Sequence, residues 1–126
     1  MKTITAEQIS DAVAQMCVRA ACELPEDVAA AIERARGAEE SPTGRDILDR
    51  IAENIRIARD EGRPLCQDTG VSVFYVEKGA DARIEGGSLY EAIDEGVRRG
   101  YTGGYLRKSI VRHPLDRVNT KDNTPA

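Results

Sequence analysis

The sequence predicts an α+β domain: a helical N-terminal part, then a small sheet with a covering helix. Apolar residues recur at helical spacing in the first half of the chain, and the β-branched and aromatic run VSVFYVE follows at residues 71–77. The length of 126 residues, with 40% hydrophobic and 32% charged residues, suits one globular domain. With one Phe, four Tyr and no Trp, the core must consist mainly of aliphatic side chains.

The first two helices are indicated by residues typical of helix starts. Thr5 followed by Gln8 forms a capping-box pattern, which predicts a helix over residues 6–22. Pro25, with two acidic residues after it, suits the first turn of a second helix. Gly37 is a typical residue to end that helix.

A third helix and two strands are expected next. The segment EESPTGRD, residues 39–46, interrupts the helical pattern, and a third amphipathic helix follows until Gly62 and Pro64 end it. VSVFYVE then predicts a largely buried strand, and ARIEGG at residues 82–87 predicts a short second one.

The last third of the chain is less regular. Ser88 is expected to cap a helix that Gly100 ends. Beyond this helix the apolar period disappears, and only residues 106–111 suggest an extended piece.

Charge is unevenly distributed along the chain. Residues 1–97 hold 11 Lys and Arg against 20 Asp and Glu, whereas residues 98–126 hold 7 against 2. This basic tail could face nucleic acid, a small polyanion or an acidic partner. The low aromatic content argues against nucleic acid, because single strands stack on aromatic side chains.

The pattern of charge and apolar residues indicates neither a membrane span nor a secretory signal. It contains no apolar run of 18 residues, and its start lacks the basic-then-apolar pattern of a secretory signal. We therefore expect a cytoplasmic protein without a membrane span. Three cysteines in such a chain suggest reduced thiols or metal ligands rather than disulfides.

The three cysteines differ in their surroundings. Cys17 and Cys22 are five residues apart, which places them on different faces of one helix, so packing roles are expected. Cys66 lies in a turn, where a functional and a structural thiol are equally consistent with its position. One cysteine cannot hold a metal centre alone, and His113 beside Pro114 is expected to be a surface residue.

The tail also offers a candidate anion site. Arg107, Lys108, Arg112 and Arg117 lie within eleven positions, and arginine binds carboxylates in a bidentate manner. Two readings stay open from these residues alone: a site for a small dicarboxylate, and a solvated loop or docking surface.

The motifs PLCQDTG and LRKSIVRHPLDRVNTKDNTPA, together with the leading helices, resemble the alpha subunit or alpha domain of class I fumarases and L-tartrate dehydratases. These enzymes are iron–sulfur hydro-lyases. The resemblance implies that residues 1–126 are the N-terminal part of a longer alpha catalytic domain, with the remainder absent from this chain.

The resemblance also implies site residues. In that family three cysteines hold a 4Fe–4S cluster, and Cys66 matches the first of them, so the other ligands would lie outside this chain. Gln67 and Asp68 match positions that line the substrate pocket, and Asp68 is expected to assist catalysis by orienting a proton-transfer partner. Arg107 matches an arginine that clamps a substrate carboxylate. At His113 relatives commonly have Asp.

The implied function is one component of an enzyme that hydrates fumarate to malate. Its partners would be a dicarboxylate, the remaining alpha segment and a beta subunit or domain in an oligomer, and the isolated chain would be inactive. Two alternatives stay open: a component of L-tartrate dehydratase, and a truncated, non-catalytic module that binds a partner subunit.

Overall fold

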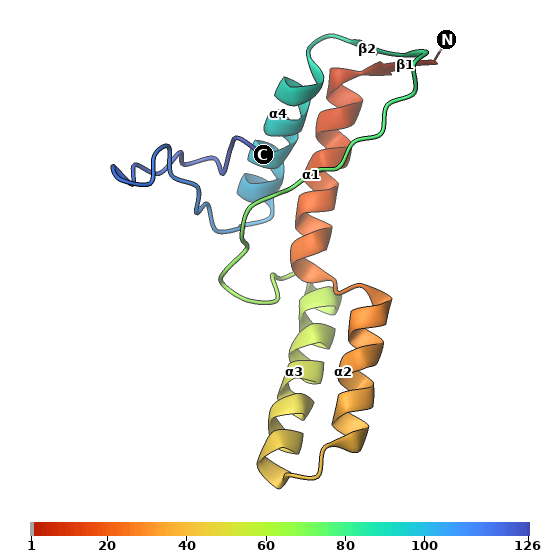
Figure 1. Ribbon diagram of the computed structural model, residues 1–126, viewed down its shortest axis with the longest axis vertical. Helices are drawn as coiled ribbons and strands as arrows, with labels where there is room; N and C mark the ends of the chain where they lie inside the picture. The colour runs from red at the N-terminus through yellow and green to blue at the C-terminus, as the bar shows by residue number, and fades with distance from the viewer. Residues whose placement is uncertain (1) are drawn as a thin grey trace. The chain divides into compact units, whose positions relative to one another are not determined.

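The structure, a computed structural model, describes residues 2–126 and confirms the predicted α+β class. Four helices and one two-stranded parallel sheet make up the regular elements of that range. The chain divides into two compact units. The first holds the described residues up to 18 together with residues 67–126, and the second holds residues 19–66. Figure 1 shows the path of the chain through both.

Helix α1 spans Ala6–Cys22, as the sequence predicts. Its capping box forms: the N–H of Gln8 donates to Thr5 Oγ1 at 3.1 Å, and the N–H of Thr5 donates to Gln8 Oε1 at 2.9 Å. These bonds satisfy backbone donors at the helix start that would otherwise lack a partner. The start of α1 is therefore determined by residues within one turn of one another.

Helix α4 spans Leu89–Gly103 and is capped by Ser88, as predicted. The N–H of Glu91 donates to Ser88 Oγ at 3.2 Å, and the Glu91 carboxylate accepts from the Ser88 N–H. The prediction that Gly100 ends this helix is wrong, because the helix continues to Gly103. Gly100 is instead a packing residue: an added Cβ would lie 2.8 Å from the carbonyl oxygen of Ala14 in α1.

Glycines at every fourth position let α4 approach α1 closely. A Cβ on Gly96 would lie 2.5 Å from Val13 Cβ, and one on Gly104 would lie 2.6 Å from a methyl group of Val18. Real Cβ atoms do not come so near, so only glycine permits this spacing. The buried apolar residues that the two helices contribute to the first unit are Val13, Cys17, Ala92, Ile93, Val97 and Tyr101.

We expect the Gly100→Ala variant to lose about 1–3 kcal/mol of unfolding free energy, because the new methyl group would overlap the backbone of α1. Gly103→Ala is the matched control, since a Cβ there meets no atom within 4 Å and alanine favours helix. Urea denaturation measures both. Equal midpoints for the two variants would contradict the close contact of α1 with α4.

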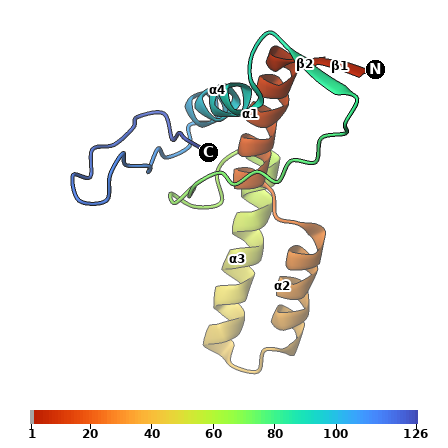
Figure 2. The ribbon, with the colours of Figure 1, turned by 45° about the horizontal axis from the view of Figure 1, so that its top comes forward.

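The sheet joins two segments of the first unit that lie far apart in the sequence. Strand β1 (Lys2–Thr5) lies parallel to β2 (Ala82–Glu85) (Figure 2). Ile4 is paired with Ile84. The sequence predicts β2 but not β1. Four residues next to a helix start are too few to show an alternating apolar pattern. Pairing with β2 is what makes this segment a strand.

The predicted strand at VSVFYVE is wrong. No residue of 71–79 belongs to a strand, and Val73 and Tyr75 are 67% and 96% exposed. Strand preference reflects the fit of a side chain to a pleated, half-buried surface, so a strand needs a neighbour. Within residues 2–126, β2 takes β1 as its partner, and VSVFYVE forms no regular element.

The second unit is a pair of helices, α2 (Glu26–Ala38) and α3 (Pro42–Glu61), which lie side by side and antiparallel (Figures 1 and 2). Gly37 lies in the last turn of α2 rather than after it. The interruption predicted over residues 39–46 is shorter than expected. Ser41 accepts from the Gly44 N–H at 3.3 Å and so starts α3 at once.

Helix α3 ends as predicted. Gly62 adopts φ +62°, a left-handed conformation that glycine reaches without strain, and its N–H donates to the Ala58 carbonyl. The chain then leaves the helix axis toward Pro64 and Cys66.

Candidate functional site

Cys66 is the last residue of the second unit, and its thiol is exposed. The residue before it is held on both sides: the Leu65 N–H donates to the Ala21 carbonyl at 2.9 Å, and Asn54 Nδ2 donates to the Leu65 carbonyl at 2.9 Å. Two fixed backbone bonds therefore position an accessible sulfur at the end of this unit. Such a turn presents a side chain more firmly than a free loop does.

The other two cysteines are buried, as predicted for packing residues. Cys17 is 7% exposed and Cys22 is 4% exposed. Burial raises the pKa of both thiols. Since the thiolate is the form that binds metal, these two residues are poor ligands.

Gln67 and Asp68 begin the return of the chain into the first unit, and both are exposed. Asp68 Oδ1 accepts from the Gly70 N–H at 3.3 Å, and Gly70 has a φ of +61°. The hydroxyl of Tyr101, a buried residue of α4, donates to the Thr69 carbonyl at 2.9 Å. A rigid aromatic side chain of the core thus holds the turn that carries Asp68.

Arg107 lies 38 residues beyond this turn, yet the structure brings the two segments together. Thr69 Oγ1 donates to the Arg107 carbonyl at 2.9 Å. Asn123 adds a second link, because Nδ2 donates to the Gly70 carbonyl at 3.2 Å while Oδ1 accepts from the Ser109 N–H at 2.7 Å. The segments that carry the candidate substrate residues are therefore joined by side-chain bonds.

The arginines of the tail differ in whether a carboxylate pairs with them. Within residues 2–126, Arg107, Arg112 and Arg117 form no ion pair, whereas Arg98 and Arg99 each bind carboxylates. All three unpaired arginines are exposed. Charges without a protein partner are available to an anionic ligand.

The tail around these arginines is a hydrogen-bonded loop rather than the extended piece expected at 106–111. Its one isolated bridge joins Val111 and Asn119. His113 Nδ1 accepts from the Leu115 N–H at 3.2 Å, which is a turn-forming role. His113 is exposed, as predicted.

Asp122 fixes the end of the tail to α4. It accepts from the Thr124 N–H at 3.2 Å and hydroxyl at 2.9 Å, and from Arg98 Nε at 3.1 Å. Burial alone would raise the pKa of Asp122, but the bonds from Thr124 and Arg98 outweigh it and lower the pKa from 3.8 to about 2. The sequence interpretation missed both Asp122 and Asn123. Their residue types signal turns, but not the distant partners.

The Asp122→Asn variant tests this anchor. Because folding lowers its pKa, Asp122 stabilises the fold above pH 3.8, and this contribution disappears as the pH falls toward 2. We expect the variant to lose about 1–2 kcal/mol of unfolding free energy at neutral pH and to depend less on pH in that interval. Denaturation across the acid range measures this. Asp116→Asn, at an exposed position, is the control and should keep the acid dependence of the parent chain.

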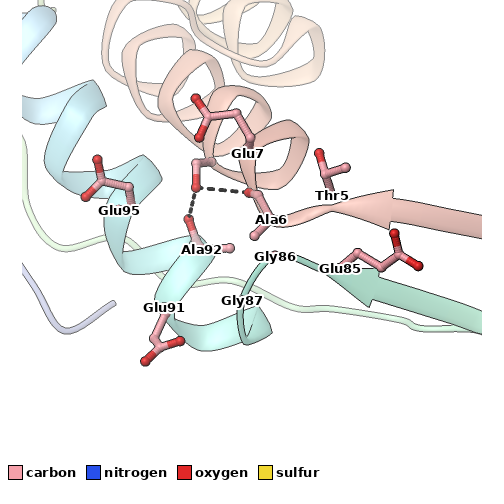
Figure 3. Close-up of a pocket in the computed structure, with 10 residues that line it drawn as sticks. Thr5, Ala6, Glu7, Glu85, Gly86, Gly87, Glu91, Ala92 and Glu95 are labelled. Carbon is pink, nitrogen blue, oxygen red and sulfur yellow. Dashed lines mark hydrogen bonds between the residues drawn. The ribbon is translucent and has the colours of Figure 1, made fainter.

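A hollow of about 470 Å³ lies between the starts of α1 and α4 (Figure 3). Arg99 donates to Glu7 at 2.7 Å and to Glu95 at 2.8 Å, and these bonds lower the pKa of both carboxyl groups. Glu85 and Glu91 add two more acidic side chains. Such a wall repels a dicarboxylate, so this hollow does not suit the predicted substrate.

A second hollow of the first unit, about 600 Å³, is apolar. Both strands, α1, α4 and residues 74–79 contribute to its wall. Met16 and Tyr75 in that wall are 50% and 96% exposed. Contiguous exposed apolar surface of this kind is typical of contacts between proteins.

An iron–sulfur cluster needs several ligands from the protein. Within residues 2–126, no group of three His, Cys, Asp or Glu side chains is placed to hold a metal ion. The exposed thiol of Cys66 fits a single ligand position. Among the described residues, Cys66 is therefore a candidate for one ligand position of such a cluster.

A family model described as fumarate hydratase (Fumerase) matches residues 10–126. The chain belongs to the fumarate hydratase family. Within this family it is similar to the putative L(+)-tartrate dehydratase subunit alpha of Methanocaldococcus jannaschii, at 40% identity over 117 residues that make up 92% of this chain and 41% of the relative.

The L(+)-tartrate dehydratase subunit alpha of Escherichia coli K12 is 30% identical over 117 residues, which cover 93% of this chain and 38% of that protein. This member of the fumarate hydratase family thus spans about two fifths of the length of these curated relatives. The resemblance noted from the motifs is confirmed. No helix in the described range has the length and apolar character needed to cross a membrane.

Proposed function

We propose that the chain is a component of a hydro-lyase that reversibly adds water to a small dicarboxylate, with fumarate and malate as the preferred pair. The observation that carries this is the bond from Thr69 to the Arg107 carbonyl, which joins the Gln67–Asp68 turn to a segment of unpaired arginines. Membership of the fumarate hydratase family supports the same reaction class.

Each exposed residue then has a distinct task. The guanidinium of Arg107 binds one substrate carboxylate through its paired N–H donors. Gln67 offers an amide that can donate to or accept from the substrate. The Asp68 carboxylate orients a proton-transfer partner by hydrogen bonding.

The Cys66 thiolate would be one ligand of a 4Fe–4S cluster whose other ligands lie outside this chain. When bound, the cluster supplies a Lewis acid for the hydroxyl group that leaves or adds. A reducing cytoplasm, the compartment predicted from the sequence, would keep the exposed thiol available for it.

We further propose that the chain acts together with more polypeptide. The two relatives are named as alpha subunits, and both are more than twice as long as the matched region. The apolar hollow and the exposed side chains of 71–76 support a contact with such a partner. The isolated chain is therefore expected to be inactive, and a beta subunit and the remaining alpha segment are its expected partners in an oligomer.

L(+)-tartrate is the second candidate substrate, because both relatives carry its name. Tartrate loses water to give oxaloacetate, and it presents two carboxylates to the same arginine. A guanidinium can bind a carboxylate of either diacid.

The test is anaerobic assembly of this chain with a beta subunit and the polypeptide that completes the length of an alpha relative. We expect the assembly to bind iron and sulfide, to absorb visible light as iron–thiolate clusters do, and to consume fumarate. Tartrate in a parallel assay ranks the two substrates by kcat/KM. A folded assembly without cluster and without activity on either diacid would favour the non-catalytic module instead.

A further inference from the structure

Asn123 is the most deeply buried polar side chain of the first unit. It has no exposed surface, and its φ of +63° places it in a left-handed conformation. Its Oδ1 accepts from the N–H groups of Ser109 and Ile110 at 2.7 and 3.1 Å, and its Nδ2 donates to the Gly70 carbonyl at 3.2 Å. Both the oxygen and the nitrogen of this amide therefore have hydrogen-bond partners inside the fold.

The three partners of this amide belong to the two segments that carry the candidate substrate residues. Gly70 is two residues beyond Asp68, and its N–H is bonded to that carboxylate at 3.3 Å. Ser109 is two residues beyond Arg107. A shift of Asn123 would thus move both sides of the candidate site relative to each other.

We infer that Asn123 is a positioning residue that sets the separation of Asp68 and Arg107. This role rests on the proposed function, because it matters only if both residues contact one substrate. The Thr69 hydroxyl bridges the same segments at 2.9 Å, and the Asn123 amide adds a second, buried bridge beside it. Two bridges fix an orientation that a single hydrogen bond leaves free to rotate.

A purely structural role would be to hold the tail on the protein, and other bonds already do so. Asp122 accepts from Arg98 Nε at 3.1 Å, and the Ala126 N–H donates to Asp94 Oδ1 at 2.9 Å. Within the tail, the Thr120 N–H donates to the Ile110 carbonyl at 2.9 Å and keeps its two halves together. The tail therefore keeps its attachment to α4 when the Asn123 side chain is removed.

Two substitutions test the acceptor and the donor of the Asn123 amide separately. Asn123→Gly removes both ends while keeping a residue that tolerates positive φ. Asn123→Asp keeps an acceptor for Ser109 and Ile110 but turns the donor toward Gly70 into a second acceptor. Lys121→Gly is the matched control, because Lys121 is exposed and has a φ of +68°, so glycine there relieves backbone strain without touching these bonds.

The first measurement is amide hydrogen exchange of Ser109 and Ile110 in the full chain. We expect faster exchange in Asn123→Gly and near-parental exchange in both Asn123→Asp and Lys121→Gly. Fast exchange in the parent chain itself would overturn the buried bridge.

The second measurement is kinetics of the assembled enzyme. We expect both Asn123 variants to raise KM for the diacid roughly tenfold at unchanged cluster content, since a small misplacement of binding groups is costly. Asn123→Asp should show this loss although Ser109 and Ile110 stay protected, which a loss of global stability would not produce. An active parent enzyme with unchanged KM in both variants refutes the positioning role alone. An inactive parent assembly refutes the proposed function, and the positioning role falls with it.

Discussion

Replacing Cys66 with serine should leave the assembled enzyme without its iron–sulfur cluster and reduce hydration of fumarate to the background rate. A serine hydroxyl stays protonated at neutral pH, whereas a cysteine forms the thiolate that binds iron. The side chain is exposed, and the backbone of Leu65 holds the turn, so the fold should survive the change. Iron content and visible absorbance measure the cluster directly, independently of turnover.

Cys22→Ala is the control for this prediction, because it also removes one thiol from the second unit. Cys22 is buried and its pKa is raised, so its loss should cost some stability but no iron. Circular dichroism establishes that both variants are folded. Full cluster content in Cys66→Ser would remove Cys66 from the metal site.

Arg107→Ala should raise KM for the dicarboxylate roughly 10- to 100-fold, which corresponds to the loss of charged hydrogen bonds. Arg107→Lys should recover only part of this, because lysine keeps the charge but not the planar pair of donors. The backbone carbonyl that accepts from Thr69 is retained in both variants, so the two segments stay joined. Steady-state kinetics on the assembled enzyme separates KM from kcat.

Arg112→Ala removes an equal charge from the same segment and is the matched control. Arg112 is also exposed and forms no ion pair within residues 2–126. If a general positive field attracts the substrate, both alanine variants should weaken binding equally and high salt should mask the difference. A specific clamp at Arg107 predicts a large effect there and a small one at Arg112.

Helix starts could be predicted from the sequence because their bonds are local. Thr5 with Gln8, and Ser88 with Glu91, each satisfy backbone donors within one helical turn. The end of α4 could not be predicted in the same way. Gly100 can end a helix or admit a neighbouring one, and the choice depends on Ala14, which is 86 positions away.

The candidate site was also only partly predictable from the sequence. Cys66, Gln67, Asp68 and Arg107 could be named from motifs, and they remain predictions for the assays above. The contact between the Asp68 turn and the Arg107 segment could not be read from either motif. It depends on Thr69 and Asn123, whose side chains bond the two segments to each other.

By itself the sequence determined the helices, the family and the residue types available for chemistry, because capping bonds and motifs lie within short stretches of chain. The tertiary structure decided which segment became a strand, which glycine packed rather than ended a helix, and which part of the tail bonds to the turn that carries Asp68. Those outcomes depend on partners many positions away. Burial and hydrogen bonding between such partners exist only once the chain has folded.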